Sequence, residues 1–374
     1  MSNIKIKPWI SSLPEYIPGG TIEEIKEKYN LKKVYKLASN ENIFGPSPKI
    51  IEYFKKGMSD INYYPDSYCR QLRKKLSKKL GISGDSIIFG NGTDQIIEMV
   101  CDAILDTGKN VIVPDPTFLT YEKSALKNGA KVIKVPLLEY RQDIKSIIKS
   151  IDNDTAIIFL TSPHNPTGSI LTKQEIDYAL NNINNDILIV LDEAYVEFVP
   201  ENDRFDSLNY IRKHDNLIIM RTFSKVFGIA GLRIGYGIGD SELISNISKI
   251  MQPFVVNSIA QIAAVISLED EDNINRNVKI IISERYKFCR RLKESGIPFV
   301  QSFSNFVLIK TGGRTPEIIE ELLKNGYMIR DGNFLGFPDY IRVSMSLPEI
   351  NKKFTDLFIA LYKKYALNLS EELS

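Results

Sequence analysis

The sequence has 374 residues, of which 43% are hydrophobic, and its 48 basic and 46 acidic side chains give a formal net charge of +2. This is the composition of an ordinary globular protein with one large and one smaller domain, and it lacks the concentrated basic excess typical of nucleic-acid-binding proteins. It contains only two histidines, His164 and His214, so we expect neither a histidine-based catalytic triad nor a metal site.

The start of the chain and its cysteines bear on the cellular compartment. The N-terminal sequence lacks the apolar core of a secretion signal, and the longest apolar runs have the length of strands. They fall far short of the roughly 20 residues that span a bilayer. The three cysteines lie far apart without paired spacing, which fits a reducing environment. We therefore expect a cytoplasmic protein without a membrane partner.

The first 35 residues carry Pro8, Pro14, Pro18 and the pair Gly19-Gly20, and predict an extended arm followed by a short helix. From residue 36 to about residue 250, short apolar runs alternate with helical patterns. The runs are rich in Ile and Val without strict alternation, which is typical of strands buried on both faces. The expected strands cover residues 86–89, 110–113, 131–135, 156–161, 188–192, 217–221 and 234–238.

The pattern changes after residue 250. Long helical stretches are expected at 275–295, 315–325 and 348–365, with short strands near 306–310, 327–330 and 340–344. We therefore expect an α/β fold whose large domain, residues 36–250, has a mostly parallel seven-stranded sheet sandwiched by helices. Residues 251–374 should form a smaller α+β domain that packs with the N-terminal arm, residues 1–35.

Polar side chains gather at the carboxyl ends of four expected strands, where α/β sheets bind ligands. They are Thr93 and Asp94, Asn165, Asp192 and Tyr195, and Ser224, Lys225 and Arg233. Some have an ordinary explanation as well, since residues 91–93 could be only a turn and a helix cap, and Lys225 could be a surface lysine. A carboxylate directly behind a buried strand, as at Asp192, is costly unless it is paired.

Together these residues match what pyridoxal phosphate (PLP) requires of a protein. PLP needs a lysine amine for its aldehyde and an acid beside its pyridine nitrogen. It also needs donors to its ring hydroxyl and a cationic cradle rich in N–H groups for its phosphate, and the helix that begins near Thr93 can supply such N–H groups. The sequence therefore indicates a PLP enzyme with Lys225 as the lysine that binds the cofactor.

A resemblance to a known family makes this more specific. Residues 221–236, RTFSKVFGIAGLRIGY, resemble the cofactor-lysine segment of fold-type-I aminotransferases and, more narrowly, of histidinol-phosphate aminotransferases. The likeness spans almost the whole chain and includes residues 37–42, 45–48, 64–66, 192–195, 253–257 and 304–307. It implies a fold-type-I PLP-dependent enzyme that exchanges an amino group between L-histidinol phosphate and 2-oxoglutarate, in histidine biosynthesis.

The resemblance also implies roles for individual residues. Lys225 would bind the cofactor's aldehyde and later move the substrate's α-proton, and Asp192 would pair with the pyridine nitrogen. Asn165 and Tyr195 would hydrogen-bond the ring hydroxyl. Phe118 would stack on the ring, although a plain core aromatic is an equal alternative for it. The cofactor's phosphate would be held by Thr93, Asp94 through its backbone N–H, Ser224 and Arg233.

Other residues would bind the substrate or complete the site from a second subunit. Arg330 and Arg342, near the ends of two small-domain strands, would bind an anionic group of the amino donor or of the 2-oxo acid. Tyr16 would close the site from the N-terminal arm. Tyr64 would reach the phosphate of the cofactor in the neighbouring subunit, so a homodimer with shared active sites is expected.

Two positions near the expected site depart from the family's pattern. His164 stands where Asn is usual, and residues 345–347 replace a Gly followed by Thr or Ser. A threonine-phosphate decarboxylase of the same fold and an aromatic-amino-acid aminotransferase are therefore alternatives. A dinucleotide-binding oxidoreductase is disfavoured because residues 90–92 lack the third glycine and because Lys225 would have no role. A non-enzymatic binding module would not need the complete cofactor set.

Overall fold

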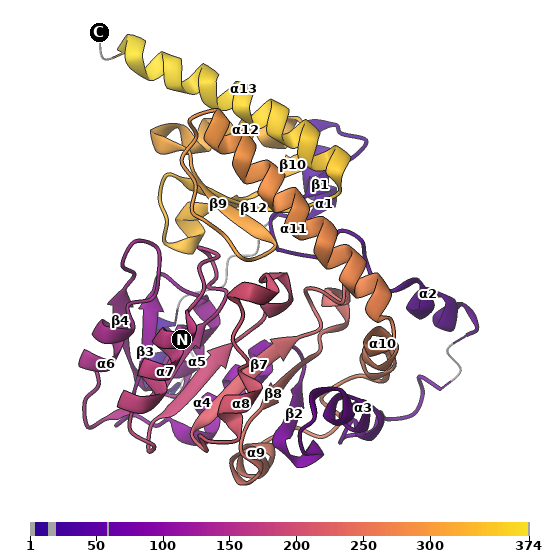
Figure 1. Cartoon of the computed structure of the whole chain (residues 1–374), viewed down its shortest axis with the longest axis vertical. Coiled ribbons are helices and arrows are strands. Elements are labelled where there is room, and N and C mark those ends of the chain that lie inside the picture. Colours follow the sequence, from indigo (N-terminus) through magenta and orange to yellow (C-terminus); the bar gives the residue numbers. More distant parts are fainter. Residues whose placement is uncertain (1–3, 14–19, 58–59, 373–374) are drawn as a thin grey trace.

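The computed structural model describes residues 4–13, 20–57 and 60–372, which form two lobes joined by a long helix (Figure 1). The lower lobe in this view surrounds a seven-stranded sheet, and the upper lobe surrounds a three-stranded sheet. Among the helices of the described residues, none is both long enough and apolar enough to cross a membrane.

The large sheet carries the candidate site. Its strand order is β2 (Ile87–Gly90), β8 (Gly235–Ile238), β7 (Leu217–Thr222), β6 (Leu188–Asp192), β5 (Thr155–Thr161), β3 (Asn110–Asp115) and β4 (Lys131–Pro136). Only β8 runs antiparallel to its neighbours, β2 and β7, and the other four pairs of this described sheet are parallel. This confirms the predicted mostly parallel seven-stranded sheet, with bounds that differ from the expected ones by at most two residues.

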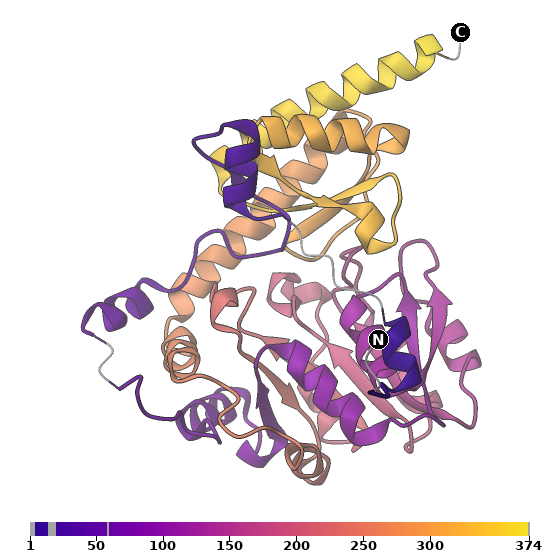
Figure 2. The ribbon, with the colours of Figure 1, turned by 180° about the vertical axis from the view of Figure 1, so that it is seen from behind.

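Both faces of this sheet are buried, which explains the unbroken Ile and Val pattern of its strands. Along β6, Ile189 and Leu191 pack on one face, whereas Leu188 and Val190 pack on the other. One face is covered by α4 (Thr93–Ile104), α5 (Leu119–Lys127) and α9 (Ser241–Ser248) (Figure 2). The opposite face is covered by α3 (Arg70–Leu80), α6 (Ile144–Lys149), α7 (Lys173–Asn182), α8 (Leu208–Ile211) and α10 (Ser258–Leu268).

The small lobe is built on an antiparallel sheet of β11 (Arg330–Asp331), β12 (Tyr340–Ser344) and β9 (Phe306–Lys310). Helices α12 (Thr315–Lys324) and α13 (Pro348–Glu372) pack on each other beside it. The single strand predicted at 327–330 is two strands, because the chain changes partner at Ile329. Strand β10 (Tyr327–Met328) pairs with β1 (Tyr35–Lys36), and β11 pairs with β12.

Helix α11 (Glu271–Glu294) connects the lobes (Figure 1). Before it, α10 packs on α2 (Pro48–Lys55) and α3 of the large lobe, and α11 then packs on α13 of the small lobe. The pairing of β1 with β10 likewise ties residues near the N-terminus to the small lobe. The division of the chain at residues 35 and 250 stays a prediction.

The N-terminal arm is described in part. Residues Pro8–Ser12 form a short 3-10 helix rather than an extended segment, and Pro8 favours this start because it has no backbone N–H to satisfy. The helix lies against α5, where the Trp9 indole donates a 3.0 Å hydrogen bond to the backbone oxygen of Lys127. The expected short helix is α1 (Ile22–Tyr29), which begins with a capping box between Thr21 and Glu24.

Candidate active site

A cavity of about 470 Å³ lies between the lobes at the carboxyl ends of the large sheet's parallel strands. Its walls also include residues 38–41 and parts of the small lobe's β11 and β12. The structure brings these predicted site residues together in its lining: Thr93, Asp94, Phe118, Asn165, Asp192, Tyr195, Ser224, Lys225, Arg233, Arg330 and Arg342. Ligand binding at this edge follows from the fold, since loops from several strand ends converge there.

Asp192 ends β6 and is 5% exposed. Its Oδ2 accepts a 2.6 Å hydrogen bond from the Tyr121 hydroxyl, and its Oδ1 accepts one of 2.9 Å from the Ala194 N–H. Burial raises the pKa of Asp192 to about 6, although both hydrogen bonds lower it. Both donors are neutral, so they leave the charge of this buried carboxylate uncompensated. A protonated ring nitrogen in the cavity would compensate it.

Lys225 follows β7 and is half-buried in the cavity lining. Its Nζ lies 3.3 Å from the backbone oxygen of Ser39 and 5.5 Å from the centroid of the Tyr195 ring. Neither neighbour is an acid that would hold the amine in an ion pair. The amine is therefore placed to react with an aldehyde in the cavity.

The N-terminus of α4 forms the anion-binding end of the cavity. Gly92 is the N-cap, and no side chain caps the helix, whose first residues, Thr93 and Asp94, line the cavity. The first N–H groups of a helix are available to an anion when no side chain accepts from them. Arg233 lies beside it, with an Nη2 atom 3.0 Å from the Asp94 carboxylate and an Nη1 atom 3.4 Å from Ser224 Oγ. The Asp94 side chain, for which the sequence predicted only a backbone role, thus orients Arg233.

Gly92 is required for this arrangement. Its φ is +80°, and a Cβ atom there would lie 2.4 Å from Nη2 of Arg233. The missing side chain leaves room for a guanidinium against the helix start, which gives the cradle both its positive charge and its N–H donors. A phosphate group fits such a cradle, and PLP therefore fits the cavity, with Asp192 and Lys225 at its ring end.

Two arginines approach the cavity from the small lobe. Arg330 and Arg342 are partners in the β11–β12 register, which places them side by side. Arg342 is buried and donates to Asn165 Oδ1 at 2.5 Å and to the backbone oxygen of Ala38 at 2.9 Å, while its Nε has no protein partner. Burial lowers the pKa of Arg342 to about 10, and the charge of Arg330 acts in the same direction.

Apolar side chains form the wall beside these arginines. Leu119 comes from the start of α5, next to Phe118, and Phe334 and Leu335 come from the small lobe. The Arg330 guanidinium lies 5.4 Å from the centroid of the Phe334 ring. The cavity lining therefore combines two cations with apolar side chains, and one of these, Phe334, lies beside Arg330.

Two polar residues of the cavity lining that bond predicted site residues were missed by the sequence analysis. Tyr121 is fully buried and bonds Asp192, and Asn40 donates a 3.0 Å hydrogen bond from Nδ2 to the Tyr195 hydroxyl. Tyr121 follows Phe118 by three residues, so helical spacing could have placed both at one sheet edge. Asn40 lies in the segment 37–42 that carried the resemblance, but no sequence signal connects it to Tyr195.

The remaining predicted residues lie elsewhere. Tyr64 is 82% exposed and outside the cavity lining, with its ring stacked on Phe254 at a centroid distance of 4.4 Å. Tyr16 lies outside the described residues. His164 is fully buried beside Asn165, and burial lowers its pKa to about 3, so its ring is neutral. His164 and the other departure, residues 345–347, lie outside the cavity lining.

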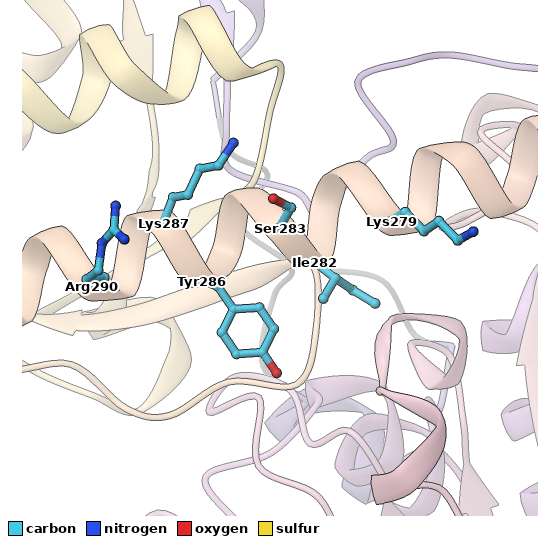
Figure 3. A pocket seen from close by; sticks show the side chains of 6 residues that line it. All are labelled: Lys279, Ile282, Ser283, Tyr286, Lys287 and Arg290. Atoms are coloured by element: carbon cyan, nitrogen blue, oxygen red, sulfur yellow. The ribbon is translucent and has the colours of Figure 1, made fainter.

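A second hollow, of about 630 Å³, runs along one face of α11 (Figure 3). Its lining consists of Lys279, Ile282, Ser283, Tyr286, Lys287 and Arg290. Lys287 and Arg290 are already paired with Glu284 and Glu294 on the same helix. Because one helix face supplies the whole lining and no candidate residue belongs to it, we place the active site in the cavity between the lobes.

Comparisons with known proteins agree with this geometry. A profile of the family described as aminotransferase class I and II matches residues 32–353. The chain is 37% identical over 367 residues to a histidinol-phosphate aminotransferase of Geobacillus sp. (strain WCH70), covering 97% of this chain and 100% of the relative. It is 38% identical over 351 residues to that of Halalkalibacterium halodurans, covering 93% and 94% of the two chains.

A solved structure has the same fold over nearly its full length. The histidinol-phosphate aminotransferase from Sinorhizobium meliloti, in complex with PLP, superposes with a TM-score of 0.86 at 26% identity, covering 98% of this chain and 99% of that one. Its cofactor agrees with the match between the cavity and PLP. The profile and these relatives show that the chain belongs to the class I and II aminotransferases, enzymes that work with PLP.

Proposed function

We propose that the protein transfers the amino group of L-histidinol phosphate to 2-oxoglutarate, giving imidazole-acetol phosphate and L-glutamate, as a step of histidine biosynthesis. The names of relatives that match nearly the whole chain at 37% and 38% identity support this substrate. The observation that carries it is the pair Arg330 and Arg342 beside an apolar wall, within the cavity that contains Asp192 and Lys225.

The arginine pair suits both substrates. Histidinol phosphate has no carboxylate, so its phosphate must occupy the place where the glutamate product presents its side-chain carboxylate. A guanidinium pairs bidentately with either group. Although Asn165 and Ala38 already accept from the two Nη atoms of Arg342, each of these atoms carries a second N–H, and the guanidinium keeps its positive charge in the cavity lining. The apolar wall of Leu119, Phe334 and Leu335 would then take the imidazole or the aliphatic part of glutamate.

The other residues would act on the cofactor and the proton. When bound, PLP supplies an electron sink that stabilises negative charge on the substrate carbon. The Asp192 carboxylate would keep the ring nitrogen protonated, and Asn165 Nδ2 and the Tyr195 hydroxyl would donate to the ring oxygen. The Lys225 amine would take the α-proton from the substrate and move it during the transfer of the amino group. Thr93, Ser224 and Arg233 would hold the phosphate, with the backbone N–H of Asp94.

A substrate panel tests the proposal. The purified protein is given histidinol phosphate, histidinol, threonine phosphate and aromatic amino acids, each with 2-oxoglutarate, and both keto product and carbon dioxide are measured. Histidinol phosphate should react fastest, and histidinol should be poor because it lacks the anion for the two arginines. If threonine phosphate releases carbon dioxide faster than histidinol phosphate transaminates, the decarboxylase alternative replaces this proposal. Faster transamination of aromatic amino acids would favour the other alternative.

The homodimer is also part of the proposal. Tyr64 stacks on Phe254, and both are exposed, as are Ile61, Tyr63 and Tyr68 from the same segment as Tyr64. Burial of these side chains against a second copy would remove apolar area from water and would place Tyr64 at the partner's cofactor phosphate. Residence in the cytoplasm is proposed as well, supported by the free state of all three cysteines, which are buried and unpaired with one another.

A further inference from the structure

Tyr121 has a fixed position beneath the cavity. It lies in the first turn of α5 and is fully buried. Its ring stacks on Phe159 with a centroid distance of 4.6 Å and meets the edge of Phe118 at 5.6 Å. These ring contacts hold the side chain without help from its hydroxyl, so the polar contacts of the hydroxyl call for a separate explanation.

The hydroxyl donates its only proton to Asp192. An ionised carboxylate can only accept, so the 2.6 Å contact with Asp192 Oδ2 uses the tyrosine proton. The hydroxyl of Thr161, 3.3 Å away, is then left to donate to the tyrosine oxygen. Burial and the charge of Asp192 raise the pKa of Tyr121 well above its usual value, so the donor keeps its proton throughout the neutral range.

Asp192 depends on such donors because its surroundings oppose its charge. Burial is the largest effect that raises its pKa, and the charges of Asp94 on α4 and of the adjacent Glu193 add to it. The hydrogen bond from Tyr121 is the largest effect in the other direction, ahead of the Ala194 N–H. The other titratable groups of the described cavity lining are Glu41, Asp94, Tyr195, Lys225, Arg233, Arg330 and Arg342.

We propose that Tyr121 is a positioning residue for the cofactor ring, because its hydroxyl keeps Asp192 ionised and fixes the orientation of the carboxylate toward the ring nitrogen. The Ala194 N–H holds one oxygen and Tyr121 holds the other, so the carboxylate plane cannot turn without breaking a hydrogen bond. Tyr121 acts only through Asp192, and this inference therefore rests on the role proposed for Asp192.

Tyr121→Phe isolates the hydroxyl, since the ring keeps its contacts with Phe159 and Phe118. Hydrogen bonds to charged groups are strong, and we expect the affinity of the apoprotein for PLP, measured by equilibrium dialysis, to fall roughly tenfold to a hundredfold. Loss of the donor raises the pKa of Asp192. As the pH is lowered and Asp192 becomes protonated, the affinity for PLP should fall. This fall should begin at a higher pH in the variant than in the wild type, in which the pKa of Asp192 is about 6.

Tyr210→Phe is the matched control. The Tyr210 hydroxyl also donates to a carboxylate, that of Asp177, but both residues lie outside the cavity lining. This variant should bind PLP with the wild-type affinity and the wild-type pH dependence. Unfolding curves of both variants show whether either substitution acts on the fold instead.

Asp192→Asn distinguishes a failure of the role proposed for Asp192 from a failure of the role proposed for Tyr121. If this variant binds PLP as tightly as the wild type and keeps its turnover, the role of Asp192 fails, whatever Tyr121 does. If Asp192→Asn loses both its affinity for PLP and its turnover, the double variant with Tyr121→Phe should bind PLP no more weakly than Asp192→Asn alone. The amide of Asn has no charge for the Tyr121 hydroxyl to stabilise. An additive loss in the double variant, or a Tyr121→Phe protein with unchanged affinity and pH dependence, would overturn the proposal for Tyr121.

Discussion

Lys225 has a place in the cavity that suits its expected chemistry, because its amine meets a backbone oxygen and an aromatic ring rather than an acid. We expect the protein with PLP to be yellow and borohydride to bleach it, with the label fixed on Lys225. Lys225→Ala should abolish turnover and leave the unfolding curve nearly unchanged. Peptide mapping that finds the label on another lysine would contradict the assignment.

Arg342 has a different position, since it is buried and donates to Asn165, and its proposed role is to bind the anionic group of the substrate. Arg342→Ala should raise the barrier of both half-reactions by roughly 2–5 kcal/mol, as expected when one partner of a buried charged pair is removed. Arg342→Lys should recover only part of the loss, because an ammonium cannot form the bidentate contact. The measurement is kcat/KM for the amino donor and for the 2-oxo acid.

The control for this prediction is Arg291→Ala. Arg291 of α11 forms a 2.7 Å ion pair with Asp356 of α13, and about a third of the Arg291 side chain is exposed. Such pairs contribute little to stability, and this one lies outside the cavity lining. Wild-type rates in Arg342→Ala would contradict a role in substrate binding, whereas equal losses in both variants would indicate an effect on the fold.

Sequence reasoning reached those site residues whose side chains directly follow a strand. Asp192 was found because a carboxylate behind a buried strand is unusual, and Lys225 because it completes what PLP requires. Asn40 and Tyr121 were missed since each acts on another side chain rather than on the ligand. Asn40 reaches Tyr195 across 155 positions of sequence, and only the folded chain brings the two together.

The start of α4 is the element on which the anion-binding end depends. Gly92→Ala would place a methyl group 2.4 Å from the Arg233 guanidinium and would strain a backbone with φ of +80°. We expect the affinity for PLP to fall roughly tenfold to a hundredfold, because Arg233 loses its charged contact with the phosphate. The free energy of unfolding should fall by roughly 1–3 kcal/mol, because φ of +80° with ψ of 171° is a conformation nearly restricted to glycine.

Gly81→Ala separates these two effects. Gly81 ends α3 with φ of +65°, and a Cβ atom there would meet nothing within 4 Å. Gly81→Ala should lose less stability than Gly92→Ala, because φ of +65° with ψ of 35° is the left-handed helical conformation that other residues can adopt. It should bind PLP normally, and the two properties are measured by thermal unfolding and equilibrium dialysis. Equal affinity in both variants would mean that Arg233 does not depend on the glycine.

The helices and strands were predictable to the extent that their own residues specify them. All seven strands of the large sheet were expected, because Ile and Val runs buried on both faces give a strong local pattern. The break between β10 and β11 was not, since it depends on the pairing of Tyr327 with Tyr35, a partner 292 positions away. The sequence pattern around a strand does not indicate a pairing partner that lies so far away along the chain.

At the scale of the whole molecule, the proposed homodimer predicts complementation between two defective chains. Lys225→Ala and Tyr64→Phe subunits should form hybrid dimers in which one of the two sites has both Lys225 and Tyr64. Random exchange of equal amounts makes half of the dimers hybrid, so about a quarter of the wild-type sites should return in a closed twofold dimer. Turnover is measured before and after verified subunit exchange.

The control mixes Lys225→Ala with Asp192→Asn. Both residues belong to the same subunit's share of the cavity, so no hybrid dimer contains an intact site and no activity should return. Recovery in neither mixture would indicate a site that is complete within one chain. Recovery in both would point to a trace of wild-type protein rather than to shared sites.

The hydrogen bonds at Asn40 have a consequence for how the enzyme is made. The Ser344 hydroxyl bonds both the backbone N–H and Oδ1 of Asn40, which it follows by 304 positions. At about 5–20 residues per second, a ribosome needs about 15–60 s to add that stretch. Until then the nascent chain exposes an incomplete cavity with its lysine already present. The side of the cavity to which β12 contributes can therefore be completed only when translation is almost finished.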